Sequence, residues 1–362
     1  MNITYLLGAG ASYNALPVVE QIPESLSLFA NQFKIKSLEW LIENDQRSRI
    51  SERYLLDITD SKEQKQKFEE ISQFYKNIVW LKDESEKHTS IDTFAKKLYL
   101  KEDFPNLKKL KFLLSCFFIY LQRKDTGLDK RYDSFFASIL DDINTLPGAI
   151  KILTWNYDSQ LEIAFKNFSD YPLDVCKSIL KCQSKSLSNR YKDLDPGSFG
   201  IYKINGTTDV NFGRNNEKPF ITDLDINDNK LIEKFLFGNN SLESNNLDFT
   251  LSFAWENHND SFFNKISNSI QNTEVLVIIG YSFPFFNRKV DEFILNSMPN
   301  LKKIYVQDPY HADDIIEKIK GLKTWKKTFY YKGSSGPEVS TKEVIDFIPK
   351  TFKDQFFIPI EF

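Results

Sequence analysis

The sequence predicts an α/β protein built on a mainly parallel β-sheet with helices on both faces. Short apolar runs typical of buried strands alternate with segments of helical periodicity. Each of these runs is followed by small or polar residues, and the first leads directly into a glycine-rich turn. In open parallel sheets, ligands bind outside the carboxyl ends of the strands. We therefore expect a Rossmann-like, doubly wound sheet, with a helical insertion after the first strand.

The first strand, residues 3–7, runs into the turn Gly8-Ala9-Gly10-Ala11-Ser12. Gly8 permits a tight turn, and Gly10 lets a phosphate group approach the backbone. The N–H groups of the helix that follows would then point at the anion. The third glycine of the dinucleotide-binding fingerprint is absent. By itself, this motif is equally consistent with an ordinary strand and turn of any α/β protein.

Four later strands end in the other candidate residues, and the most apolar of them, at 274–279, is expected to be central. Asn and Asp after a strand also form ordinary turns and helix caps, and Tyr281 could be a core aromatic beside a plain β-turn. Because the carboxyl ends of parallel strands meet at one edge, we favour a shared site. The residues are Thr154 at the end of strand 150–154, Asn156 and Asp158 after it, Asn205 and Gly206 after 200–204, Gly280, Tyr281 and Ser282 after 274–279, and Asp308 after 303–307.

Residues 25–145 have mainly helical periodicity, with an amphipathic helix at 132–143 as the clearest example. We interpret 1–362 as a single domain, in which 25–145 is a helical insertion and 146–362 is the remainder of the Rossmann-like core. Near the end of the chain, Ser340 and Glu343 have the spacing of a capping box, which predicts a final helix.

The composition excludes several classes of protein. A net charge of −3 gives no reason to expect nucleic-acid binding. Three cysteines without a C-x-x-C pair argue against a disulfide framework or a structural zinc site, so we expect no metal and a cytoplasmic location. The N-terminus lacks the pattern of a signal peptide. The longest apolar run, 112–121, is too short to span a bilayer, so we expect no membrane association.

The ordered motifs Gly8–Ser12, Asn156-Tyr157-Asp158, Asn205-Gly206, Gly280-Tyr281-Ser282 and Asp308 resemble the sirtuin-like superfamily over nearly the whole chain. They look most similar to its bacterial branch, whose members hydrolyse NAD in antiphage defence. The resemblance implies cleavage of NAD to nicotinamide and ADP-ribose in abortive infection. It also implies NAD or ADP-ribose as ligand, and a homo-oligomer or a partner defence protein that restrains the activity.

The resemblance also implies roles for individual residues. No metal is required, because nicotinamide leaves as a neutral group. Asn156 would contact the nicotinamide-side ribose and position the attacking water, with Asp158 near the nicotinamide pocket. Thr154 and Gly206 are expected among the binding residues. The loop Gly8-Ala9-Gly10-Ala11-Ser12 would hold the pyrophosphate, Gly280, Tyr281 and Ser282 would line the adenosine ribose, and Asp308 would reach the adenine end.

One position departs from the family, which usually has His-Gly where this chain has Asn205-Gly206. Asparagine cannot take up a proton at neutral pH. Asn205 could still hold the ribose and permit hydrolysis, the site could bind without turnover, or His258 or Asp209 could supply the base.

Two functions outside NAD hydrolysis follow from these alternatives. One is a catalytically weak NAD or ADP-ribose sensor or assembly subunit of a defence complex. The other is a nucleosidase or transferase acting on another nucleotide. Protein deacylation is disfavoured, because the sirtuin deacylases carry a zinc module of four cysteines and this chain has three.

Overall fold

The chain forms two compact units, which we call the sheet unit and the helical unit. The sheet unit contains residues 1–15, 128–207 and 252–362, and the helical unit contains residues 16–127 and 208–251. The computed structural model describes residues 1–43, 62–124, 127–184, 195, 197–212, 227–244, 246–253, 255–256, 260–322 and 345–360.

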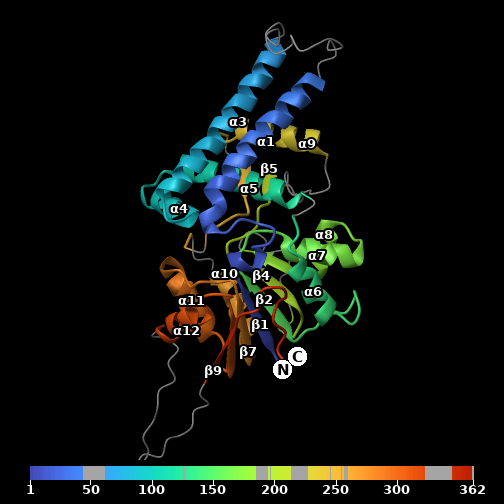
Figure 1. Cartoon of the computed structure of the whole chain (residues 1–362), viewed down its shortest axis with the longest axis vertical. Helices are drawn as coiled ribbons and strands as arrows, with labels where there is room; N and C mark the ends of the chain where they lie inside the picture. Colours follow the sequence, from blue (N-terminus) through green and yellow to red (C-terminus); the bar gives the residue numbers. More distant parts are fainter. Residues whose placement is uncertain are drawn as a thin grey trace, which may run out of the picture. The chain divides into compact units, whose positions relative to one another are not determined.

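A seven-stranded parallel sheet forms the centre of the sheet unit and confirms the predicted α/β, Rossmann-like fold (Figure 1). Its order is β3-β4-β2-β1-β7-β8-β9, and every neighbouring pair is parallel. The chain first fills the β2 side of β1, where β4 lies between β2 and the edge strand β3, and fills the β7 side afterwards, so the strand order reverses beside β1. The strands are β1 (Ile3–Leu7), β2 (Ile150–Thr154), β3 (Cys182–Ser184), β4 (Gly200–Lys203), β7 (Val275–Ile279), β8 (Lys303–Gln307) and β9 (Asp346–Lys350).

The central strands are buried on both faces, which explains their nearly continuous apolar sequences. Along β1, Tyr5 and Leu7 join the apolar cluster on one face, while Leu6 joins the cluster on the other. The first face packs against α6 (Lys130–Ile139), α7 (Gln160–Ser169) and α8 (Leu173–Ile179). The second face packs against α10 (Asp260–Ile270), α11 (Arg288–Asn296) and α12 (Ala312–Lys320). Helices therefore cover both faces, as a doubly wound sheet requires.

The helical unit is built around aromatic side chains. Phe33 packs edge-to-face on Phe74 with ring centroids 4.6 Å apart, and Phe235 lies against both rings. Its described elements are α1 (Ile22–Glu43), α3 (Lys62–Lys87), α4 (Ile91–Leu100), α5 (Phe104–Gln122), α9 (Asp228–Asn240) and the antiparallel pair β5 (Val210–Phe212) and β6 (Leu247–Phe249).

The helical character expected between the first two strands is present in the described residues there, which form α1 and α3 to α6. The last of these, α6, belongs to the sheet unit. That residues 25–145 act as one insertion into a single domain stays a prediction. Among the residues that the structure describes, no helix is long and apolar enough to cross a membrane.

The predicted helix at the end of the chain is wrong in its described part, because Asp346–Lys350 form the edge strand β9 beside β8. Phe347 packs on one face of the sheet and Ile348 on the other, the period of two that a strand requires. The capping box at Ser340 lies outside the described residues. Its local signal does not reveal the open edge of β8, which pairs with these residues instead.

Candidate functional site

Three neighbouring strands place the candidate residues side by side. In the sheet register, Leu7 is opposite Thr154 of β2 on one side and Ile279 of β7 on the other. The turns that follow β1, β2 and β7 therefore begin at the same level of the sheet. This is the point where the strand order reverses, and there open α/β sheets form a crevice for ligands.

The turn after β1 packs directly on the turn after β7. The N–H of Gly8 donates to the Ile279 carbonyl at 3.0 Å, and the N–H of Gly10 donates to the Gly280 carbonyl at 3.0 Å. A Cβ on Gly10 would lie 2.7 Å from the Gly280 Cα, and a Cβ on Gly8 would lie 2.5 Å from the Gly280 carbonyl oxygen. Gly280 itself has a φ of +59°, which favours glycine.

The close packing of the turn after β1 on the turn after β7 is thus enough to explain why Gly8, Gly10 and Gly280 are glycines. The Ala11 N–H is also engaged, since it donates to the Gly8 carbonyl at 2.9 Å. Residues 9–12 form a short 3-10 helix instead of the start of a long α-helix. Pyrophosphate binding by this loop stays a prediction, and any phosphate there would have to compete with these internal hydrogen bonds.

Asn156 and Asp158 meet the glycine turn at Ser12. The Asn156 Nδ2 donates to the Gly8 carbonyl at 2.9 Å and to the Ser12 Oγ at 3.3 Å. The Ser12 hydroxyl donates to the Asp158 Oδ2 at 2.9 Å. The Thr154 Oγ1 accepts from the Asn156 N–H at 3.0 Å and so fixes the start of this turn. These predicted residues therefore form one connected network.

Asp158 is a buried carboxyl in a charged surrounding. Burial raises its pKa above the ordinary value, and the nearby Lys203 ammonium opposes the shift. Lys203 donates to the Asp158 carbonyl and forms a buried ion pair with Glu162 at 2.8 Å. Because its ionised form is the one penalised by burial, the Asp158 carboxylate would be stabilised by an additional positive charge nearby.

Asn205 lies one strand further along, at the end of β4. Its Nδ2 donates to the Trp155 carbonyl at 3.0 Å, which ties the turn after β4 to the turn after β2. Gly206 follows with a φ of +76°, a conformation that explains the glycine. Asn205 thus occupies the same edge as Asn156, and its own hydrogen bond supports the backbone beside Asn156.

Tyr281 is a buried aromatic. Its hydroxyl donates to the Asp291 carboxylate at 2.9 Å and accepts from the Asn287 Nδ2 at 3.2 Å. Its ring stacks on Trp155 with centroids 5.3 Å apart and planes 14° apart. The predicted contact of Tyr281 with a ribose stays a prediction. In the structure its described contacts are those of a core residue.

Ser282 and Asp308, predicted for the adenosine end, line one open surface pocket of about 630 Å³. The Asp308 Oδ1 accepts from the N–H groups of Tyr310 at 3.0 Å and of His311 at 2.8 Å. The Lys318 Nζ donates to the Ser282 carbonyl at 3.0 Å. Acidic side chains on α12 also line this pocket. Its volume lies within the range of small-molecule sites.

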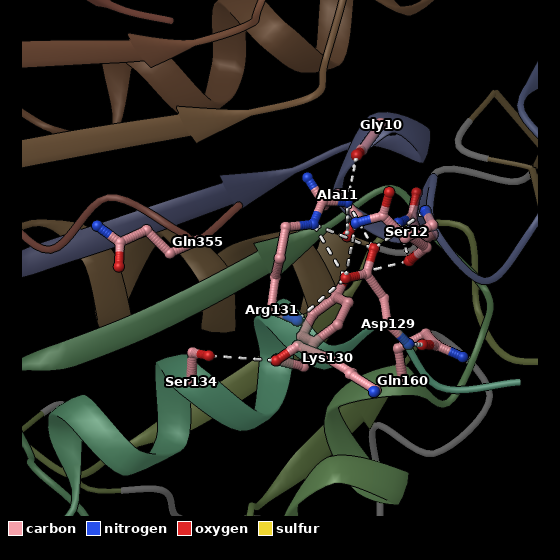
Figure 2. A network of polar contacts seen from close by, with 12 residues as sticks. Gly10, Ala11, Ser12, Asp129, Lys130, Arg131, Ser134, Gln160 and Gln355 are labelled. Atoms are coloured by element: carbon pink, nitrogen blue, oxygen red, sulfur yellow. Dashed lines mark hydrogen bonds and ion pairs between the residues drawn. The ribbon is translucent and has the colours of Figure 1, made fainter. Parts of the chain in front are cut away.

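The buried ion pair of Arg131 and Asp129, which was not predicted from the sequence, contacts the glycine turn (Figure 2). The Arg131 Nη2 donates to the carbonyls of Gly10 and Ala11, each at 3.1 Å, and pairs with the Asp129 carboxylate at 2.5 Å. Asp129 in turn accepts from the Asn14 N–H at 3.1 Å and donates its own N–H to Gln160 at 2.8 Å. The pair therefore connects the start of α6 with the turn after β1 and the start of α7.

The structure describes two of the three histidines. His88 lies in the helical unit, His311 is exposed beside the surface pocket, and His258 lies outside the described residues. Asp209, the other alternative base, belongs to the helical unit. Within the described ranges, no group of three or more His, Cys, Asp or Glu side chains could hold a metal ion.

No protein-family model matches this chain. A comparison with curated proteins also gives no significant match.

Proposed function

We propose that the sheet unit binds NAD and hydrolyses its nicotinamide glycosidic bond, giving nicotinamide and ADP-ribose. The observation that carries this proposal is the network of Asn156, Ser12 and Asp158 at the switch point of the sheet. Its support is the combination of a polar amide and a buried carboxyl at the place where such sheets bind nucleotides.

Asn156 has the geometry of a residue that orients a reactant. Its Nδ2 is held by the Gly8 carbonyl and by Ser12, so the side-chain amide has a fixed orientation. Its Oδ1 accepts no hydrogen bond from any residue that the structure describes, and the residue is partly exposed. That oxygen can accept a hydrogen bond from a ribose hydroxyl or from the attacking water, and fixed positioning of this kind accelerates hydrolysis.

Asp158 supplies the electrostatic part of the mechanism. Cleavage of the glycosidic bond develops positive charge at the anomeric carbon, as in glycosidases, where carboxylates stabilise this charge. Burial raises the pKa of Asp158, so a developing positive charge would stabilise its ionised form. Ser12 holds the carboxylate in place through the 2.9 Å hydrogen bond.

The adenosine end is proposed to occupy the pocket beside Ser282 and Asp308. Carboxylates accept hydrogen bonds from ribose hydroxyls and adenine amino groups, and the pocket carries several of them. In this assignment the nucleotide would extend along the carboxyl edge from β2 to β8.

We further propose that the chain acts as an effector of bacterial antiphage defence, on the basis of its resemblance to the sirtuin-like NAD hydrolases. Constant NAD hydrolysis would kill the cell that makes it. A homo-oligomer or a partner defence protein would therefore restrain the activity in a cytoplasmic setting until infection.

The second candidate function is that of a catalytically weak sensor or assembly subunit that binds NAD or ADP-ribose. It is favoured by Asn205, since asparagine cannot act as a base and its Nδ2 already supports the Trp155 carbonyl. Isothermal titration separates the two functions. Stoichiometric NAD binding without nicotinamide release would identify the sensor.

The hydrolase is tested by measuring nicotinamide release by wild type, Asn156→Ala and Asn300→Ala. Asn300 is an exposed asparagine of the same unit, before the amino end of β8, and provides a matched control. The Asn156 variant should lose at least about a hundredfold in rate, because positioning at the reacting centre is lost, while the Asn300 variant should keep its rate. Equal rates in all three proteins would remove Asn156 from the mechanism.

A further inference from the structure

Trp155, the first residue after β2, has a buried indole N–H with no hydrogen-bond partner among the residues that the structure describes. The side chain is 5% exposed, and its Nε1 makes no hydrogen bond to any residue within the described ranges. A buried tryptophan N–H usually finds an acceptor, because leaving a buried donor unsatisfied is costly. An exception in a folded protein calls for a specific explanation, such as a role for the group in binding or catalysis.

The position of the ring makes a ligand the natural explanation. The backbone N–H of Trp155 donates to the Leu7 carbonyl at 2.9 Å, and the backbone carbonyl of Trp155 accepts from the Asn205 Nδ2. Its ring stacks on Tyr281, which follows β7. Because β2 and β7 lie on opposite sides of β1, the stacked pair spans the carboxyl end of β1. The unsatisfied donor is therefore at the switch point of the sheet, next in sequence to Asn156.

We propose that the Trp155 indole N–H donates a hydrogen bond to a neutral oxygen of the bound nucleotide. This inference rests on the proposed function and makes Trp155 a residue that selects the ligand. The acceptor is expected to be neutral because Trp155 packs within an apolar cluster with Leu6 and Leu153, where an anion would be poorly solvated. A ribose hydroxyl and a nicotinamide carboxamide both offer such an oxygen.

The variant Trp155→Phe removes the N–H and keeps an aromatic ring for the stack on Tyr281. Trp80→Phe is the matched control, since Trp80 lies in the helical unit, where its ring contacts Phe94. Isothermal titration with NAD should show binding about three- to tenfold weaker for Trp155→Phe, the effect of one neutral hydrogen bond. Trp80→Phe should bind as wild type does.

Titration with ADP-ribose, which lacks the carboxamide, identifies the acceptor. An equal loss of affinity for NAD and ADP-ribose assigns the hydrogen bond to a ribose oxygen. A loss confined to NAD assigns it to the carboxamide.

An NMR measurement distinguishes ligand contact from a structural role, because Trp155→Phe also shrinks a buried side chain and should lower the unfolding temperature for that reason alone. In the ¹⁵N spectrum the indole resonance that is lost in Trp155→Phe should shift when NAD is added.

Unchanged NAD affinity in Trp155→Phe would overturn the inference and leave the proposed function standing. A Trp155 indole resonance that stays in place when NAD binds would overturn it too, since the N–H would then make no contact with the nucleotide. NAD binding without hydrolysis would count against the hydrolase, but the NAD affinities of wild type and Trp155→Phe could still be compared. A wild-type chain that binds neither NAD nor ADP-ribose would refute the proposed function and this inference together.

Discussion

Arg131 should be among the most sensitive positions in the sheet unit. Its guanidinium pairs with the fully buried Asp129 carboxylate and donates to the carbonyls of Gly10 and Ala11 (Figure 2). The substitution Arg131→Met keeps much of the side-chain length and removes every one of these interactions. Among the described residues, the N–H donors of Asn14 and of residue 131 itself then remain beside the buried Asp129 charge.

Removing one partner of a buried ion pair costs about 3–5 kcal/mol, because the other charge stays buried without compensation. The double variant Asp129→Asn/Arg131→Met has no buried charge at this place. It should therefore be more stable than Arg131→Met alone, with a coupling energy of at least about 1 kcal/mol. The comparison separates the pair from the hydrogen bonds to the glycine turn, which both variants lose.

Urea unfolding followed by tryptophan fluorescence measures these free energies at neutral pH. Lys302→Met serves as the control, because Lys302 forms an exposed pair with Glu274 at 2.9 Å. Such a pair contributes about 0–1 kcal/mol. If Arg131→Met were destabilised no more than Lys302→Met, the buried pair of Arg131 and Asp129 would not contribute to the free energy of unfolding, and this reasoning would be refuted.

Three other substitutions test separate parts of the sheet unit. Gly280→Ala should lower the free energy of unfolding in urea by at least about 2 kcal/mol, because φ is +59° and the added Cβ would collide with Gly10 and Ala11. A variant as stable as wild type would contradict the packing described. Burial raises the pKa of Asp291 to about 8, so the stability that this group contributes is full below its unfolded pKa and is lost as pH rises through about 8. Asp291→Asn should therefore flatten the fall in unfolding temperature between the unfolded pKa and about pH 8. Parallel plots of unfolding temperature against pH for the variant and wild type would argue against this role of Asp291. Asn205→His should preserve or raise the proposed NAD hydrolysis if the pocket is arranged as in the sirtuin-like hydrolases, and a folded, inactive variant would indicate a different arrangement.

The sheet was predictable because its central strands carry their own signal. Val275–Ile279 is buried on both faces and therefore reads as an uninterrupted apolar run, and the small and polar residues after each strand mark its carboxyl end. Parallel pairing then brings those ends to one edge, so the proximity of Gly8, Asn156 and Gly280 follows from the fold class.

The parts that escaped prediction depend on contacts between distant residues. Arg131 and Gly10 are 121 positions apart, and nothing local to either residue indicates their hydrogen bond. The one available signal was a charged Asp-Lys-Arg run at the start of an amphipathic helix, which ordinarily faces solvent. The buried hydroxyl of Tyr281 likewise required Asp291 and Asn287, which the helix α11 and the turn before it bring inward.

The role of glycine was only partly visible from the motif. A Gly-x-Gly turn after a strand suggests a phosphate, yet Gly8 and Gly10 also have the turn after β7 packed against them. The sequence gives no means of distinguishing close approach by a ligand from close approach by another part of the backbone. Both require the absence of a Cβ.

NAD hydrolysis at the carboxyl edge formed by β1, β2 and β7 is tested most directly by incubating the purified chain with NAD and quantifying nicotinamide and ADP-ribose together. If this edge is the proposed site, both products should appear in equal amounts, and both should be lost in Asn156→Ala. Absence of both products would contradict the proposed hydrolysis, whether or not calorimetry shows NAD binding.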